Sequence, residues 1–93
     1  MIAMRAGNFI DEDKLNRKEA IHFVAFLEEE KWRHVLAMRA ADEARYIYAH
    51  IPVLKLAYET SVIRHIEDIK YTQQVIDKIV TKYNITIKDL IGV

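Results

Sequence analysis

The sequence has no cysteine, one proline and two glycines among its 93 residues. Without cysteine there are no disulfide bonds and no thiolate-bound zinc or iron–sulfur centres, which suits a cytoplasmic protein, and we expect that location. Because proline and glycine are the residues that most often interrupt helices, their scarcity favours long helices joined by few turns.

An excess of charge of one sign is also lacking, since 14 Lys and Arg balance 14 Asp and Glu. No whole-molecule field therefore attracts the chain to phosphates or to acidic membranes. No stretch approaches the roughly 20 apolar residues needed to cross a bilayer. Residues 1–10 lack the apolar core of a signal peptide. We expect a protein that is neither secreted nor embedded in a membrane.

The residues that are present favour a folded chain, with 52% hydrophobic and 30% charged. A chain of this length supports one hydrophobic core, so residues 1–93 are expected to form a single domain. Residues 1–15 show no periodicity and are predicted to be a flexible N-terminal arm. Residues 84–93 form a C-terminal tail. The abundance of isoleucine, with little glycine, also suits a thermophilic source.

Two long helices are predicted, over about 16–50 and about 52–83. Asn16 and Glu19 have the spacing of a capping box, which marks the start of the first helix. Pro52 disfavours helical backbone at the preceding residue but is well tolerated at the first position of a new helix. The pattern therefore predicts an all-α helical hairpin. The alternative, in which Pro52 only kinks one longer helix, remains open at this point.

The second helix is amphipathic, because its apolar residues recur on one side at about 100° per residue. Asn84 is suited to the left-handed conformation that often ends a helix. Thr86 and Asp89 repeat the spacing of a capping box. A short helical turn is therefore predicted in the C-terminal tail.

The first helix has apolar side chains around most of its circumference, so one partner helix in the same chain cannot cover it. At 1.5 Å per residue it would be roughly 50 Å long, against about 30 Å for the diameter of a compact domain. We expect a homodimer in which two hairpins form a four-helix bundle, and open-ended assembly is the alternative. The residues expected at the interface are Phe23, Phe26, Leu27, Trp32, Leu36, Ala37, Ala41, Ala44, Ile47 and Tyr48.

Three residues are candidate metal ligands: Glu30 and His34 on the first helix and His65 on the apolar stripe of the second. Carboxylates and imidazoles that project into a helical bundle are typical ligands of di-iron and di-manganese proteins. Those proteins use Glu-x-x-His, whereas this chain has Glu-x-x-x-His and no second copy of the motif. The competing interpretation is a buried or half-buried polar pair of Glu30 with Arg33 or His34 that fixes the register of the dimer. No cofactor is predicted.

Two Arg-x-x-x-x-His pairs occur on the first helix, Arg17 with His22 and Arg45 with His50. This spacing resembles the motif of the HEPN ribonucleases, helical proteins that pair an arginine and a histidine across a dimer to cleave RNA. The resemblance implies these four residues as candidate catalytic groups. A polar residue commonly follows the arginine in that family, and Lys18 fits this pattern whereas Tyr46 departs from it.

The leading functional prediction is a non-enzymatic helical homo-oligomer that acts as a binding, regulatory or assembly module. This prediction allows for a further protein partner. The alternative is a nucleic-acid-associated protein, either a HEPN-like ribonuclease or a small structural binder or coat subunit. Basic and acidic residues are interleaved on the outer face of the second helix, which is typical of a solvated face rather than of a nucleic-acid stripe. The sequence leaves nucleic-acid binding undecided and does not favour catalysis.

Overall fold

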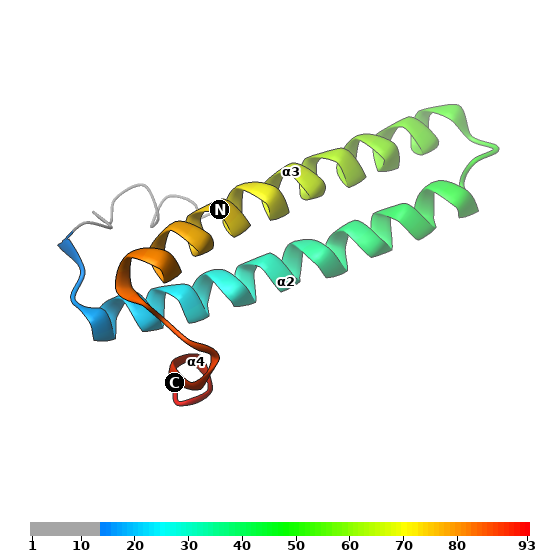
Figure 1. The fold of residues 1–93 in the computed structure, drawn as a ribbon. Coiled ribbons are helices and arrows are strands. Elements are labelled where there is room, and N and C mark those ends of the chain that lie inside the picture. The colour runs from blue at the N-terminus through cyan, green and yellow to red at the C-terminus, as the bar shows by residue number, and fades with distance from the viewer. Residues whose placement is uncertain (1–13) are drawn as a thin grey trace.

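The computed structural model describes residues 14–93, and all regular structure in that range is helical. Helix α2 covers Arg17–Ile47, α3 covers Pro52–Tyr83 and α4 covers Ile87–Ile91. Helices α2 and α3 run antiparallel as a long hairpin, and α4 folds back beside the start of α2 (Figure 1). Most of the predicted N-terminal arm, residues 1–13, lies outside the described range.

The predicted capping box at the start of α2 is confirmed. The Glu19 N–H donates to Asn16 Oδ1 at 2.8 Å, and the Asn16 N–H donates to Glu19 Oε1 at 2.9 Å. The helix ends at Ile47, three residues before the predicted end at 50. The chain must reverse before Pro52, and a turn in which the Ile51 N–H donates to the Tyr48 carbonyl at 2.9 Å occupies the intervening residues.

Pro52 begins a new helix, so the hairpin is the correct choice and the kink is not. Ile51 has extended backbone, with φ −116° and ψ 97°, as expected for a residue before proline. Asn84 ends α3 with φ 53°, which confirms its predicted left-handed conformation. Thr86 and Asp89 form the second capping box, and the predicted turn is the five-residue helix α4.

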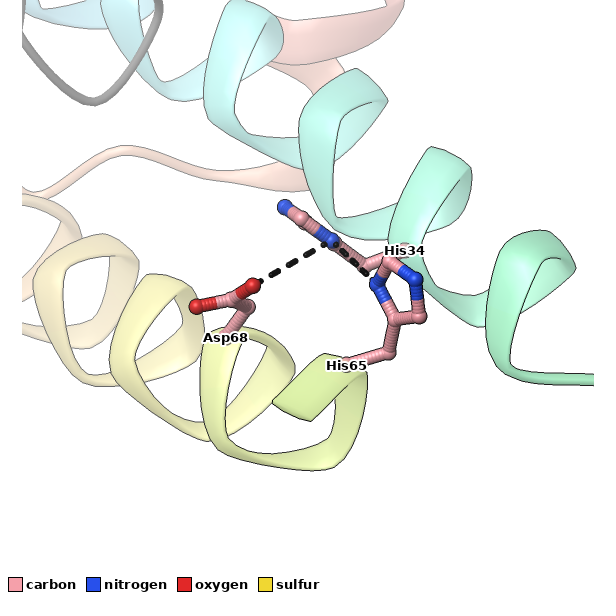
Figure 2. Close-up of side chains that lie close together, drawn as sticks. All are labelled: His34, His65 and Asp68. Atoms are coloured by element: carbon pink, nitrogen blue, oxygen red, sulfur yellow. Dashed lines mark hydrogen bonds and ion pairs between the residues drawn. The ribbon is translucent and has the colours of Figure 1, made fainter. Parts of the chain in front are cut away.

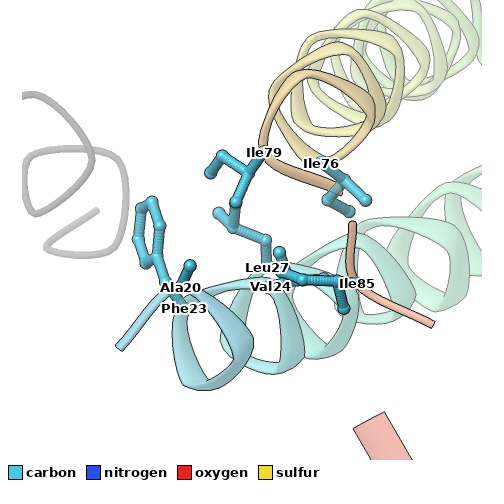
Figure 3. Close-up of a cluster of buried hydrophobic side chains, with 7 residues drawn as sticks. All are labelled: Ala20, Phe23, Val24, Leu27, Ile76, Ile79 and Ile85. Atoms are coloured by element: carbon cyan, nitrogen blue, oxygen red, sulfur yellow. The ribbon is translucent and has the colours of Figure 1, made fainter. Parts of the chain in front are cut away.

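The hydrophobic core lies at the end of the hairpin opposite the turn, where α2 begins, and Figure 3 shows its side chains. Val24 of α2 and Ile79 of α3 are almost fully buried there, and burial of one such side chain stabilises a fold by about 1.5–3 kcal/mol. The chain segment before α4 closes the cluster from a third direction. The residues of this terminal core are Ala20, Phe23, Val24, Leu27, Ile76, Ile79 and Ile85.

Polar contacts also stabilise the end of the hairpin where α2 begins. Arg17 donates to the carbonyls of Tyr83 and Asn84 at 3.2 and 3.0 Å and pairs with Asp89 at 2.8 Å. Hydrogen bonds from the Thr86 N–H and from Arg17 hold the pKa of Asp89 below its ordinary value of 3.8. The start of α2, the end of α3 and α4 are therefore joined through one guanidinium group.

Toward the turn, the hairpin is a single layer of two helices. The described molecule measures 52 × 26 × 18 Å, and its third helix, α4, lies at the end opposite the turn (Figure 1). Outside the terminal core, the buried hydrophobic residues of the described chain are Ala41 and Val62. Trp32, Leu36 and Leu56 are each more than half exposed. One face of each long helix thus packs on the other helix, and the remaining faces lie open.

Candidate functional site

Three side chains that can bind a metal ion meet near the middle of the hairpin: His34 from α2, and His65 and Asp68 from α3 (Figure 2). The two Nδ1 atoms are 3.0 Å apart, and His34 Nδ1 is 3.7 Å from Asp68 Oδ2. One ligand atom of each residue lies within 4.8 Å of the others. The antiparallel packing therefore brings together two of the three sequence candidates for metal binding.

Helix geometry explains this meeting. His65 lies three residues after buried Val62, on the side of α3 that packs on α2. Asp68 follows three residues later and is a neighbour of His65 on the helix surface. The two imidazole rings are tilted by 46° with centroids 5.3 Å apart, so they meet through their nitrogens and not by stacking. In the hydrogen bond between them, one Nδ1 donates and the other accepts.

Glu30, the third sequence candidate, lies outside this cluster. Its carboxylate accepts from Arg33 Nη1 at 2.8 Å, which is the polar pair that the sequence offered as the competing interpretation. Asp68 takes its place and was missed by the sequence analysis. The available signal was the His65-x-x-Asp68 spacing, which puts both groups one turn apart on one helix.

The Arg-x-x-x-x-His pairs lie at opposite ends of α2. Arg17 is held by Asp89 and by two backbone carbonyls at the terminal end, near exposed His22. Arg45 pairs with Asp42 at 2.7 Å, and His50 lies in the turn. Since Arg17 is engaged in fastening the fold, its placement adds no support to the ribonuclease alternative.

The residues expected at the interface divide into three groups by burial. Phe23, Leu27 and Ala41 are buried inside the single chain. Ala37 and Ala44 are half-buried. The members of the set that remain exposed on the hairpin are Phe26, Trp32, Leu36, Ile47 and Tyr48. Only the exposed and half-buried members are available to a partner.

One broad side of the hairpin carries a series of polar contacts, and we call it the ion-pair side. Lys31 donates to Glu28 at 2.6 Å and crosses to Gln73 of α3 at 2.7 Å. Gln73 in turn donates to Asp77 at 2.8 Å. Asp42 pairs with Arg45 on the same flank of α2, and Lys55 pairs with Glu59 on the same flank of α3. These polar groups pair within one chain, although the buried Nε of Arg45 has no hydrogen-bond partner among the described residues.

The opposite broad side carries small residues together with Arg33, which pairs with Glu30 at 2.8 Å, and we call it the alanine side. At 100° per residue its central positions are Ala37, Ala40 and Ala44 of α2 and Ala57, Thr60 and Ser61 of α3. An open groove follows α3 on this side, and it extends from Val53 through the small residues to Arg64, His65 and Asp68. The histidine cluster thus lies at one end of a groove with a floor of small side chains.

Within residues 14–93, no helix combines the length and the apolar character that crossing a bilayer requires. Comparison of the chain with protein-family models, with curated proteins and with solved structures finds no match.

Proposed function

We propose that this protein is a non-enzymatic helical assembly module, in which two copies pair through their alanine sides into a four-helix bundle. The observation that carries the proposal is the groove of small residues on α3, flanked on the same side of the hairpin by large exposed side chains. Small residues permit close approach of helices, and an exposed apolar face of this kind is typical of an interface.

A second copy is the occupant that the charges of this surface favour. Arg64 and Asp68 lie on the alanine flank of α3, two residues on either side of position 66. Consider a two-fold axis at the level of position 66 that is perpendicular to the helices and lies between the two alanine sides. This axis places α3 of one copy antiparallel to α3 of the other. Arg64 of each copy then faces Asp68 of the other. Such reciprocal pairing is what an isologous interface requires.

The side-chain sizes favour the same axis. Tyr71, which is 47% exposed, and Ser61 are each five residues from position 66, so Tyr71 of one copy faces the small residues of the other. On α2 the same level lies near position 33, because the helices are antiparallel and His34 contacts His65, and Phe26 and Ala40 are each seven residues from that position. A large side chain opposes a small one in both pairs of helices, which gives the interdigitated packing of bundles.

The test is the molar mass in solution, measured by light scattering over a concentration series. The parent chain is expected at twice its mass of 10.9 kDa. Thr60→Glu places a charge in the groove and is expected to give the monomer. Thr81→Glu makes the same change at another exposed position of α3, outside the groove, and should leave the dimer intact.

Two results would overturn the proposal. One is a parent chain that remains monomeric at concentrations well above micromolar. The other is a dimer that Thr60→Glu and Thr81→Glu affect equally, because the groove would then not be the interface. Mass that grows without limit with concentration would instead support the open-ended assembly alternative and refute the closed dimer.

A further inference from the structure

We propose that His34, His65 and Asp68 form a zinc site that fastens α2 to α3 near the middle of the hairpin. All three ligands come from one chain, so the site does not depend on the proposed dimer. Only one carboxylate oxygen of Asp68 is directed at His34, which leaves the other for Arg64 of a second copy (Figure 2).

The distances fit one ion. Zinc–nitrogen and zinc–oxygen bonds of roughly 2.0–2.1 Å in a tetrahedral site place any two ligand atoms about 3.3 Å apart. The Nδ1–Nδ1 distance of 3.0 Å and the distance of 3.7 Å from His34 Nδ1 to Asp68 Oδ2 lie on either side of that value. The third pair of ligand atoms, from His65 and Asp68, lies within 4.8 Å, so rotation of the partly exposed Asp68 side chain would complete the three-ligand set.

The donor chemistry suits zinc and disfavours the divalent ions that prefer oxygen ligands. Two imidazoles and one carboxylate suit zinc, whereas magnesium and calcium prefer sites made of oxygen atoms. Zinc also has no geometric preference from its d-electrons, which suits ligands on two helices of fixed spacing. Binding requires both Nδ1 atoms to be deprotonated, so the ion replaces the proton that now joins the two rings.

Burial and access also suit an ion. The His34 side chain is 22% exposed and the Asp68 side chain 42% exposed, so the cluster is partly shielded but not sealed. In the single chain, before a second copy covers it, the groove of the alanine side reaches His65 and Asp68 from the turn end and provides an entry path. With three protein ligands, the fourth position of a tetrahedral ion is left to water.

The decisive experiment uses the two histidines outside the cluster as a matched control. Zinc binding to the full chain is measured by calorimetry after chelator treatment, for the parent, His34→Ala/His65→Ala and His22→Ala/His50→Ala. The parent is expected to bind one zinc per chain. The first double variant should bind at least about 100-fold more weakly, since loss of an outer-shell partner alone costs about 10–100-fold. The second should bind as the parent does.

Two further readouts separate a built site from loose association. Zinc should raise the melting temperature of the parent and of His22→Ala/His50→Ala, but not that of His34→Ala/His65→Ala. Cobalt(II) should give the intense visible absorption of a tetrahedral complex only with chains that retain His34 and His65. If the double alanine variant loses its helical circular dichroism, His65→Gln is used in its place. Glutamine is close to histidine in size and polarity, so it disturbs the packing between α2 and α3 less than alanine does.

The inference fails if His34→Ala/His65→Ala binds zinc as tightly as the parent, or if the parent binds none. It also fails if His22→Ala/His50→Ala loses binding, because exposed histidines would then be the ligands. Each titration is repeated in the Thr60→Glu background. Zinc bound by a monomeric Thr60→Glu chain would support the site whether or not the dimer proposal holds, and binding lost there would refute a site made by one chain.

Discussion

The two halves of the hairpin are built from the same two helices but differ in how their apolar residues are covered. At the terminal end, Val24, Ile79 and Ile85 are buried in a core that three chain segments enclose. At the turn end, Tyr46, Ile47 and Val53 are all more than half exposed. A third segment therefore completes one half within the chain, while the other half has two helices only.

The difference comes from which residues occupy the seam between the helices. Large aliphatic and aromatic side chains fill it near the termini, whereas Ala37, Ala41 and Ala44 occupy the first helix toward the turn. Alanine buries little area, so the helices there gain less from packing on each other. We infer that the terminal half is stable by itself and that the turn half gains its remaining burial from a second copy.

The largest effect is expected from emptying the terminal core. Ile79→Ala removes a side chain that is 1% exposed, and it should lower the free energy of unfolding by about 2–5 kcal/mol. Ile63→Ala is the control, because Ile63 lies on the same helix and is 60% exposed, and it should change that free energy by no more than about 0.5 kcal/mol. Chemical denaturation followed by circular dichroism measures both.

Equal losses from Ile79→Ala and Ile63→Ala would mean that the terminal half is no more self-contained than the rest of the hairpin. The contrast between the two halves would then disappear. Measuring both variants at a concentration where the chain is monomeric separates this comparison from the effect of association.

The next effect should appear in association and not in folding. Tyr71→Ala removes the large side chain that the proposed pairing places against Ser61 of the second copy, and the dimer should weaken by about 1–2 kcal/mol, or roughly 10-fold. Tyr46→Ala is the matched control, because Tyr46 is 72% exposed near the ion-pair side. Analytical ultracentrifugation gives both dissociation constants. A dimer weakened as much by Tyr46→Ala would place the interface elsewhere.

Local signals predicted much of the fold. The capping boxes at Asn16 and Thr86 and the left-handed Asn84 depend on neighbouring residues only, so the sequence was sufficient for them. The end of the first helix was misplaced by three residues because no glycine or proline marks Tyr48. That boundary depends on how the chain reverses before Pro52, which is a property of the packed hairpin.

The candidate site was predicted only in part, because its assembly depends on the register between two helices. His34 and His65 stood out as imidazoles on seam positions, but their distance followed only once α2 and α3 were aligned. Asp68 looked like any surface carboxylate until that alignment placed its Oδ2 atom beside His34. Glu30 looked equally eligible, and its bond to Arg33 became visible only with the side chains in place.

A smaller effect should follow from reversing the charges at the proposed two-fold axis. Arg64→Asp places like charges opposite each other and should weaken the dimer by about 0.2–1 kcal/mol, the usual range for an exposed pair. Arg64→Asp combined with Asp68→Arg restores opposite charges and should recover the parent dissociation constant. The measurement is made at low salt with chelator, so that metal binding by Asp68 plays no part. A double variant weaker than Arg64→Asp would exclude this register.

The smallest effect is expected at the exposed pair that fastens the terminal half. Asp89 has a pKa below 3.8, because the Thr86 N–H and Arg17 stabilise its charged form. A carboxyl group with a lowered pKa in the folded state contributes stability that is fully present above its unfolded pKa and is lost as the pH falls through the folded pKa.

Asp89→Asn should therefore lower the melting temperature at pH 7, by less than Ile79→Ala does. The gap between Asp89→Asn and the parent should narrow as the pH falls below 3.8. Melting curves followed by circular dichroism at several pH values measure this gap, and Asp77→Asn, which alters a carboxylate on the ion-pair side, is the control. A gap that stayed constant down to the acid transition would show that Asp89 acts through the hydrogen bonds of the capping box and not through its charge.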